Sequence, residues 1–239
     1  MKQLKYLFLA LLLTVSVFAN DEIKLQYRFQ PGKRYTMTSH TVWNFYGTSG
    51  QRVINKMSLD INADVIYREV MNQGQEALVE FRVTKNLLNG KKNPTGLPND
   101  NITFRLKNDG TNDLSRYSGS PARAYFFYSF PAQPVAPGRD TWKNFYDFYS
   151  RDASVSIEMD VRFEKIMVLN GKKVALLKMH GKGSLDSRMT GGQPGIVKVS
   201  SEVYFDYHSG IMVRNVTRGI LLTKQNEQTA DFIATTHVN

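Results

Sequence analysis

The chain has 239 residues, no cysteine, and 31 Lys and Arg against 21 Asp and Glu, which gives a formal net charge of +10. The lack of cysteine excludes a disulfide-stapled scaffold and disfavours a structural zinc site. The basic balance favours acidic partners such as anionic lipid head groups, lipopolysaccharide, acidic glycans or nucleic acid. Solvation of charges beside turns, as at Lys91-Lys92 and Lys172-Lys173, is the simpler explanation of the same balance.

The N-terminal residues have the pattern of a secretory signal peptide. Lys2 and Lys5 precede an apolar run over residues 7–18, and the run ends in a Val-Phe-Ala cleavage pattern. The run is too short to cross a bilayer as a helix. We therefore expect a signal peptide over residues 1–19, a mature chain from about Asn20, and a periplasmic or secreted location. No cysteine follows the cleavage pattern, so a lipid-anchored lipoprotein is not expected. An N-terminal membrane anchor or a buried helix is the alternative.

Strand patterns dominate the first half of the remaining chain. Apolar side chains alternate with polar ones over residues 25–29 and again over 57–65, a period that buries one face of a strand. The pattern predicts strands at 25–29 and 35–46, a hairpin over 57–83 that turns at Asn72-Gln73-Gly74, and a strand at 102–106. Residues 86–101 are predicted to form a loop.

The second half has the same pattern. Residues 155–181 predict a hairpin that turns at Asn170-Gly171, and residues 197–207 and 211–224 predict another. Residues 232–238 predict a closing strand. Helix signals are poor, and we expect one or two short helices at most, with residues 125–128 and 142–150 as the best candidates.

A repeated turn suggests that the two halves arose by duplication. Pro31-Gly32-Lys33-Arg34-Tyr35 returns as Pro137-Gly138-Arg139-Asp140-Thr141-Trp142, and a long alternating segment follows each copy. A shift of 98 positions superposes the hairpins, with Ser58 on Ser156 and Asp60 on Glu158. Alternation makes any two β-hairpins look alike, so the inference of duplication rests on the two matching Pro-Gly turns.

These patterns predict a mainly β protein. We expect large curved antiparallel sheets (a half-barrel, a barrel or a sandwich) built from two similar halves with few short helices. The expected boundaries are residues 20–130 for the first half, 131–142 for a proline-rich connector and 143–239 for the second half. The halves could form one domain or two closely packed ones.

The centre of the chain carries the candidate binding residues. Ten aromatic residues lie between Tyr125 and Tyr149, on both sides of the connector. They could plug the seam between the halves, or some could line an apolar ligand pocket, where a tyrosine hydroxyl can stay hydrated. The candidate ligand-binding residues of the pocket hypothesis are Tyr125, Phe127, Tyr128, Trp142, Phe145, Tyr146 and Tyr149.

No catalytic or metal-binding motif stands out. His40, His180, His208 and His237 lack metal-site spacing, and no Gly-x-Ser-x-Gly or phosphate-binding loop is present. Asp206 and His208 lie two residues apart on a strand end, where local backbone hydrogen bonds explain them better than catalysis does. We expect no enzyme activity, no metal and no cofactor.

The order of motifs resembles a broad group of exported bacterial two-repeat β proteins. It has a Leu-x-Tyr-x-Phe-x-x-Gly start at Leu25, a Phe-Pro-x-x-Pro-Val-x-Pro-Gly-x-x-Trp element over residues 130–142 and a Val-Tyr-Phe-Asp-x-x-x-Gly strand over 203–210. The long hairpins are also similar, at fold level, to the half-barrels of periplasmic lipoprotein and lipid carriers. The resemblance implies an exported β protein and supplies no catalytic residue.

Three functions follow from these observations. The first is a non-enzymatic envelope binding protein that holds a lipid or another apolar or anionic ligand in a bent sheet. The second is an envelope structural or interaction module, such as an adhesin or assembly partner, without a ligand cavity. The third is an outer-membrane β-barrel, against which the central position of the aromatics and the Thr-His-Val-Asn terminus argue.

Overall fold

The fold was analysed in a computed structural model that describes residues 22–47, 52–93, 101–114, 117, 128–149, 153–187, 194–223, 225 and 227–239. Within them the chain forms β-strands and one 3-10 turn, η1 (Asn72–Gly74). The strands are β1 (Arg34–Tyr46), β2 (Val53–Met71), β3 (Glu76–Leu88), β4 (Lys91–Lys92), β5 (Asn101–Lys107), β6 (Thr141–Tyr149), β7 (Ala153–Leu169), β8 (Lys172–Ser187), β9 (Gly195–Asp206), β10 (Ile211–Thr223) and β11 (Gln228–Val238).

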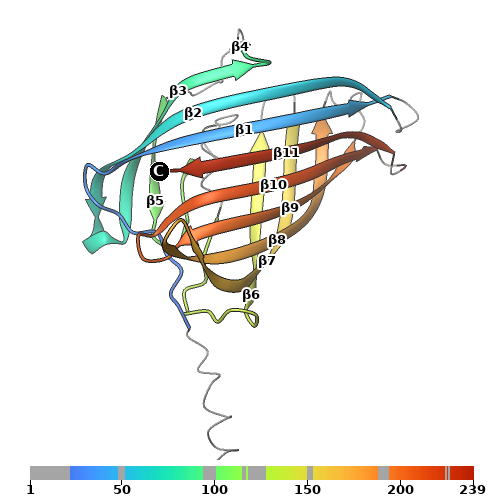
Figure 1. The fold of residues 1–239 in the computed structure, drawn as a ribbon. Helices are drawn as coiled ribbons and strands as arrows, with labels where there is room; N and C mark the ends of the chain where they lie inside the picture. The colour runs from blue at the N-terminus through green and yellow to red at the C-terminus, as the bar shows by residue number, and fades with distance from the viewer. Residues whose placement is uncertain are drawn as a thin grey trace, which may run out of the picture.

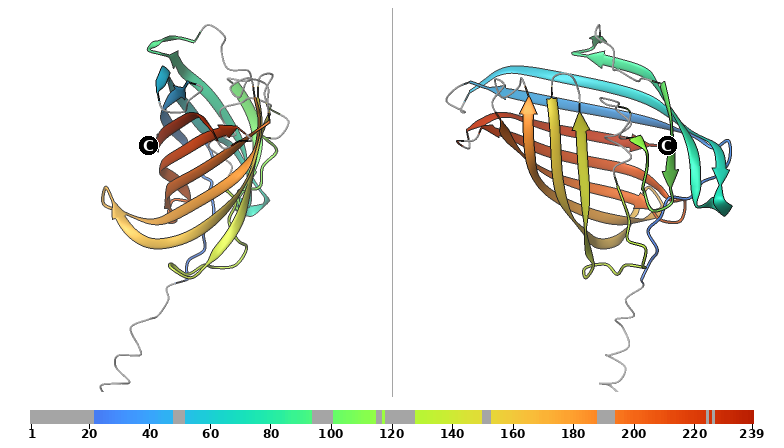
Figure 2. Two further views of the ribbon diagram at one scale, coloured as in Figure 1. Left: turned by 90° about the vertical axis from the view of Figure 1, so that its right-hand side faces the viewer. Right: turned by 180° about the vertical axis from the view of Figure 1, so that it is seen from behind.

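All of these strands belong to one antiparallel sheet. Its order is β4-β3-β2-β1-β11-β10-β9-β8-β7-β6, and β5 pairs with β3 beside β4. The two sequence halves meet where β1 pairs with β11. The sheet is open and strongly curved, so that β6 and the adjoining parts of β7 and β8 lie across from β1 and β11 (Figures 1 and 2). This confirms the predicted mainly β fold with a large curved antiparallel sheet.

The core lies on the concave face because the strands alternate as the sequence predicted. In β1, Tyr35 and Met37 are buried, whereas their neighbours Arg34 and Thr36 are exposed. Apolar residues of every long strand from β1 to β11 join one cluster on this face. Burial of that apolar surface, at about 25 cal/mol per Å², is the main favourable term in folding.

Three predictions of local structure fail in the described region. The loop predicted at 86–101 contains the end of β3, which runs to Leu88, and strand β4 (Lys91–Lys92). Residues 25–29 belong to no strand, because they leave the sheet and cross its concave face, although Leu25 and Tyr27 are buried as the alternation required. The helix candidate at 142–150 is instead strand β6 over residues 141–149. Its aromatic and β-branched side chains favour a pleated, half-buried surface over a helix. Residues 125–127 lie outside the described residues.

The repeated Pro-Gly turns occupy the same place in both halves. The Gly32 N–H donates to the Tyr67 carbonyl over 2.7 Å, and the Gly138 N–H donates to the Phe163 carbonyl over the same distance. A β-bulge follows each of these aromatic residues, between Tyr67 and Glu69 in the first half and between Phe163 and Lys165 in the second. The duplication stays a prediction, but the two turns make the same backbone contact.

These contacts correct the predicted superposition. The turns and bulges match Tyr67 to Phe163, an offset of 96, whereas the returning strands match Ala77 to Ala175, an offset of 98. After its bulge, β7 forms two more residue pairs with β8 than β2 forms with β3. The turn between β7 and β8 is two residues shorter than the turn between β2 and β3. The superposition of Ser58 on Ser156 is therefore displaced by two positions. An even displacement keeps every side chain on the predicted face.

Close backbone approach at two glycines of β8 accompanies the bend of the sheet. A Cβ added at Gly183 would overlap the Ser156 carbonyl and lie 2.7 Å from the Ile157 Cα, and one at Gly181 would lie 2.5 Å from Met159 Cγ. Glycine inside a strand often marks such a bend. These positions let β7 and β8 approach one another more closely than a side chain would allow.

We expect Gly183→Ala to lower the free energy of unfolding by roughly 1–3 kcal/mol, because the added methyl group must displace the β7 backbone. Chemical denaturation followed by circular dichroism measures the change. Ser184→Ala, on the exposed face of the same strand, is the control and should stay within about 0.5 kcal/mol of the parent. Equal effects of the two substitutions would contradict this role for Gly183.

Charged side chains cover the convex face beside both bulges. Glu80 of β3 is buried beside Arg82, whose guanidinium is 2.5 Å away, and beside the bulge residue Arg68. In the second half the charges are reversed, because the bulge residue Glu164 pairs with Lys178 of β8. The hydrogen bond from Arg82 is the main cause that holds the pKa of Glu80 below its ordinary value.

Because the folded-state pKa of Glu80 is lowered, its stabilisation is present above the unfolded pKa of about 4.3 and is lost as pH falls through the lower folded value. We expect Glu80→Gln to weaken the fall of the unfolding free energy with decreasing pH below about pH 5. Urea denaturation at a series of pH values measures this slope. Glu69→Gln, at an exposed site on β2, serves as control and should retain the parent slope.

Candidate functional site

The structure distributes the predicted binding residues over different environments. Tyr128 is buried in the core, and the Trp142 indole packs against the core and donates to the Ser129 carbonyl over 2.9 Å. Strand alternation places Tyr146 on the concave face and Phe145 on the convex face, where 66 % of Phe145 is exposed. Tyr125, Phe127 and the side chain of Tyr149 lie outside the described residues. The described four therefore do not line a common pocket, and their role in ligand binding stays a prediction.

Two segments without ladder pairing fill one end of the concave face, and we call them the plug: residues 22–30 and residues 128–136. They are joined by a pair of 2.9 Å hydrogen bonds between Ile23 and Val135. The Tyr27 ring lies 5.4 Å from that of Phe130 and 5.7 Å from that of Phe205, measured between centroids. The plug thus seals this end of the sheet with aromatic contacts.

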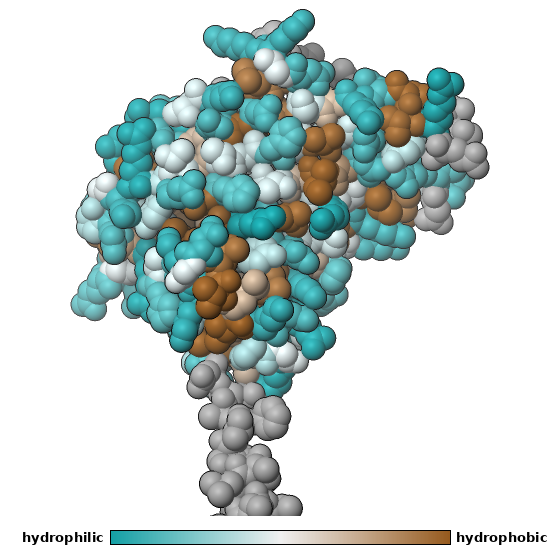
Figure 3. Space-filling view, viewed as in Figure 1, coloured by the Kyte–Doolittle hydropathy of each residue, from teal (hydrophilic) through white to brown (hydrophobic). Residues whose placement is uncertain are grey.

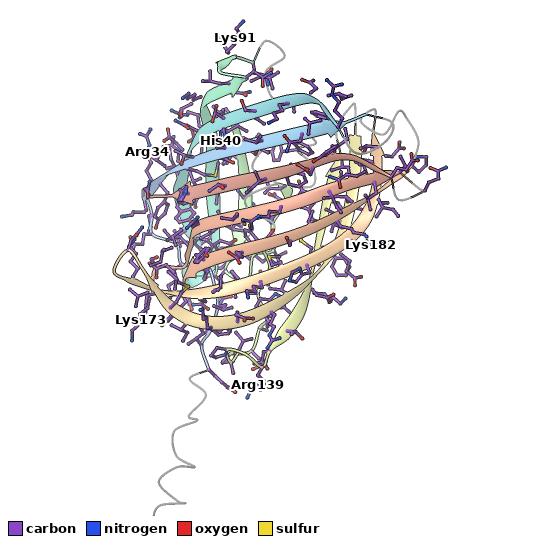
Figure 4. All side chains as sticks on the ribbon, turned by 45° about the vertical axis from the view of Figure 1, so that its right-hand side comes forward. Arg34, His40, Lys91, Arg139, Lys173 and Lys182 are labelled. Carbon is purple, nitrogen blue, oxygen red and sulfur yellow. The ribbon has the colours of Figure 1, made fainter. Side chains whose placement is uncertain are left out.

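The plug is also tied at its outer margin. Arg139, which lies in the second Pro-Gly turn and is labelled in Figure 4, forms ion pairs with Glu22 at 2.8 Å and with Asp140 at 2.9 Å. The Lys24 ammonium donates to the Ala132 carbonyl over 2.6 Å. The hydrogen bond from Arg139 is the main cause that lowers the pKa of Asp140, with a further contribution from the Ala136 N–H. These contacts fix residue 22, just beyond the expected cleavage site, against the connector.

A small cavity of about 30 Å³ lies beneath the plug, which is room for about one water molecule. An acyl ligand needs a site roughly ten times larger or more. The Tyr27 hydroxyl is buried and has no hydrogen-bond partner among the described residues, and burial raises the pKa of Tyr27 well above its ordinary value. The cavity is lined by Tyr27, Tyr35, Met37, Val65, Tyr67, Ile211, Met212 and Val238. Among the described residues, the plug end is therefore packed as a core, and this cavity is too small for a lipid.

Away from the plug, the concave face carries aromatic side chains that remain partly exposed. The Trp43 and Phe232 rings lie 4.5 Å apart and the Trp43 and Phe45 rings 6.4 Å apart, between centroids. The ladder register places Phe45 of β1 and Tyr146 of β6 in one transverse row across the sheet. We call Trp43, Phe45, Phe232 and Tyr146 the aromatic end.

The position of the Phe232 ring depends on a glycine in the neighbouring strand. Gly219 of β10 lies directly opposite Phe232 of β11, and a Cβ at Gly219 would overlap the Phe232 ring. The Phe232 ring therefore occupies the space that a side chain at position 219 would need, and its centroid lies 4.5 Å from that of Trp43. Aromatic side chains commonly cover glycine in this way in sheets.

A band of buried polar side chains separates the plug from the aromatic end. Thr236 donates to Ser39 over 3.2 Å, Ser201 and Thr217 share a 2.8 Å hydrogen bond, and Thr217 donates to the Asn215 side chain over 3.2 Å. The band crosses β1, β11, β10 and β9. Buried polar groups are expensive unless they are hydrogen-bonded, and these are paired with one another.

Two lysines face one another on the convex face behind the aromatic end, and Glu158 of β7 lies on the other side of Lys182. Lys182 of β8 and Lys198 of β9 are directly opposed, and neither forms an ion pair within the described part of the chain. Figure 4 shows Lys182 at the opposite end of the sheet from Arg34 and Lys173. Like charges that face one another across strands are destabilising on their own. The convex face seen in Figure 3 is otherwise mostly hydrophilic, with separate small apolar patches.

An exposed acid–histidine pair, His40 Nδ1 and Asp60 Oδ1 at 2.6 Å, is present, but a metal site is not assembled in the described residues. No group of three His, Asp or Glu side chains there could hold a metal ion. The Asp206 carboxylate accepts the backbone N–H groups of His208 and Ser209, at 3.0 and 3.1 Å, which confirms its predicted local role. Burial opposes ionisation of Asp206, but the bonds from Ser209 and His208 outweigh it and lower the pKa. Among the described residues there is no helix long and apolar enough to cross a membrane.

Sequence reasoning indicated Tyr146 but missed the other members of the aromatic end, because they are far apart in the chain. Trp43 and Phe232 are separated by most of the sequence and meet through the pairing of β1 with β11. Each lies in a segment that the pattern identified as a strand, so their shared face was predictable. Their proximity could be predicted only from the order of the strands in the sheet.

We expect Tyr27→Phe to leave the unfolding free energy unchanged or to raise it by up to about 1 kcal/mol, because it removes a buried hydroxyl that has no hydrogen-bond partner among the described residues. Tyr27→Ala should cost about 3–5 kcal/mol, since it also removes the ring from the plug. Denaturant titration of the purified mature protein distinguishes the two. A Tyr27→Phe variant whose free energy of unfolding falls by more than about 1 kcal/mol would contradict the conclusion that this hydroxyl has no hydrogen-bond partner among the described residues.

Comparisons with known proteins identify no family. No protein-family model and no curated protein matches the chain. Among solved structures, a protein from Bacteroides fragilis described as exported, with a YmcC-like fold, is 8 % identical, with a TM-score of 0.32 over 89 % of this chain and 98 % of that one. A DUF1329 family protein from Desulfovibrio piger is also 8 % identical, with a TM-score of 0.22 over 87 % and 84 %. At these values the functional proposal rests on this chain's own residues.

Proposed function

We propose that the protein is exported to the cell envelope and binds an amphiphile with an apolar chain at the aromatic end, without catalysing a reaction. Export is supported by the charged, apolar and small-residue pattern of residues 1–19. Binding is supported by one observation above all: the aromatic end keeps partly exposed aromatic side chains on the concave face, beside the buried Leu221, Val197 and Ile157 of the same row. Partly exposed aromatic surface of this kind is typical of ligand-contact sites.

The geometry also favours a direction for the ligand. The buried polar band and the plug block the concave face beyond Ser39, so the chain of the amphiphile would lie along Trp43, Phe45 and Phe232. The Lys182 and Lys198 pair, on the convex side of the same end, supplies positive potential for an anionic head group. The proposed ligand is therefore a fatty acid or an anionic lipid.

A dansyl-labelled fatty acid tests this proposal in the purified mature protein. The chain has two tryptophans, Trp43 and Trp142, so a Trp142→Phe background makes Trp43 the energy donor to the bound dansyl group. We expect saturable energy transfer. Phe232→Ala in that background should weaken binding by about 10-fold, because the loss of one buried aromatic contact corresponds to about 1.4 kcal/mol.

Tyr204→Ala is the matched control, since Tyr204 lies on the convex face of β9 beside Arg214. It should bind the probe as the parent does. A neutral dansyl-labelled amide tests the contribution of charge, and Lys182→Gln with Lys198→Gln should remove any preference for the acid. Absence of saturable transfer, together with native protein that carries no extractable lipid by mass spectrometry, would refute the proposal.

The interaction module remains the second candidate, and the filled plug end favours it. Tyr27, Phe130 and Phe205 occupy the space in which a carrier of this shape would hold its ligand. If the aromatic end binds no amphiphile, the module is the better description. Co-purification of a defined envelope protein with the mature chain, in the absence of bound lipid, would support it.

A further inference from the structure

Strand β6 ends the sheet on the side opposite β4 and β5. It pairs with β7 in an unbroken register from Thr141 to Tyr149, and no described strand pairs with its other edge. A terminal strand presents backbone N–H and C=O groups that can pair with another strand. β6 is therefore a candidate surface for strand addition.

The two edges of the sheet differ in how they are protected. At one edge β4 has two residues, both lysines, and β5 is short, carries Arg105 and Lys107, and is bridged to Asn112. Short strands and charges are the usual means by which proteins block edge-to-edge pairing. β6 spans nine residues, contains no proline and has no bulge. Its only charged side chains are Lys143 and Asp147, one of each sign, and it lacks the other blocking features.

The convex side of β6 carries an apolar side chain at its centre. Phe145 is 66 % exposed and points away from the core. On either side of it along the same face lie Lys143 and Asp147. The Lys143 ammonium is held by Glu158 at 2.5 Å and Asp160 at 2.7 Å, and the Asp147 carboxylate accepts the Ser156 hydroxyl over 2.6 Å. Both charged groups are thus fixed on the convex surface.

This arrangement is self-complementary. If two β6 strands pair antiparallel about Phe145, each Lys143 lies opposite the other chain's Asp147, and the two Phe145 rings meet on the two-fold axis. A displacement of two residues in either direction places Lys143 or Asp147 opposite a Phe145 ring. A displacement of four places Lys143 opposite Lys143, or Asp147 opposite Asp147. Cross-strand pairs of opposite charge and of aromatic rings stabilise, whereas like charges destabilise.

We propose that two copies of this chain associate through antiparallel pairing of their β6 strands about Phe145, which would join the two sheets into one. The interface is isologous, as in most two-fold dimers. Main-chain hydrogen bonds supply much of the affinity in strand addition, and side chains fix the register. The exposed ion pairs contribute little free energy and act mainly to select the register.

A cysteine at the two-fold axis tests the register directly. Residues that face one another across an antiparallel pair have Cα atoms about 4.5–5.5 Å apart, within the range of a disulfide, and the chain has no other cysteine. Under mild oxidation we expect Phe145→Cys to form a disulfide-linked dimer that excess parent protein suppresses. Val168→Cys, at a site on β7 that is 64 % exposed, is the matched control and should remain largely monomeric.

Charge substitution at the same position tests association without a crosslink. In sedimentation velocity the parent should show a concentration-dependent dimer. Phe145→Lys and Phe145→Glu should each be monomeric, because like charges would meet on the axis, and their equimolar mixture should recover the dimer. Thermal melting verifies that each variant is folded, as expected at an exposed position.

Three outcomes would overturn the proposal. The first is parent protein that stays monomeric at all accessible concentrations, with Phe145→Cys crosslinking no faster than Val168→Cys. The second is a dimer that persists in both Phe145→Lys and Phe145→Glu, which would place the contact elsewhere. The third is a mixture of these two variants that stays monomeric although the parent dimerises.

Discussion

The structure depends on how the concave face of a single open sheet is kept from water. A sheet curved in this way exposes apolar side chains on its inner face unless another layer covers them. Here the cover comes from two strandless segments, whose Tyr27 and Phe130 rings pack on Phe205 at one end of the face. The ion pair between Arg139 and Glu22 holds one segment beside the other. The stability of the whole sheet therefore depends on a plug that is not itself part of the sheet.

Because the plug covers one end, the concave face has two regions with different properties. Beneath the plug the packing leaves about 30 Å³, and the aromatic rings act as core. Beyond the buried band of Ser39, Thr236, Asn215, Thr217 and Ser201, the rings remain partly exposed. The plug thus limits where an apolar ligand can be accommodated, and the basic pair at Lys182 and Lys198 marks the same end electrostatically.

Several elements could be predicted from the sequence, and the failures have physical causes. The hairpins at 57–83 and 155–181 were predicted because alternation and turns that contain Asn and Gly are local signals. Residues 25–29 alternate equally well but cross the sheet unpaired, since alternation reports burial of one face and not hydrogen bonding to a neighbour. Strand β6 was mistaken for a helix candidate, although its alternation separates Tyr146 from Phe145. Of the candidate site, the sequence indicated Tyr146 but could not connect it to Trp43 or Phe232.

The sequence by itself determined most of the strands, which of their faces is apolar, and that a Pro-Gly turn precedes each long hairpin. These properties depend on neighbours within a few positions, so they can be read locally. Only the tertiary structure decided that the halves join through β1 and β11, that residues 22–30 and 128–136 form a plug, and that Phe45 and Tyr146 share a row. Those features depend on strand order and curvature, which are set by contacts between residues far apart in the chain.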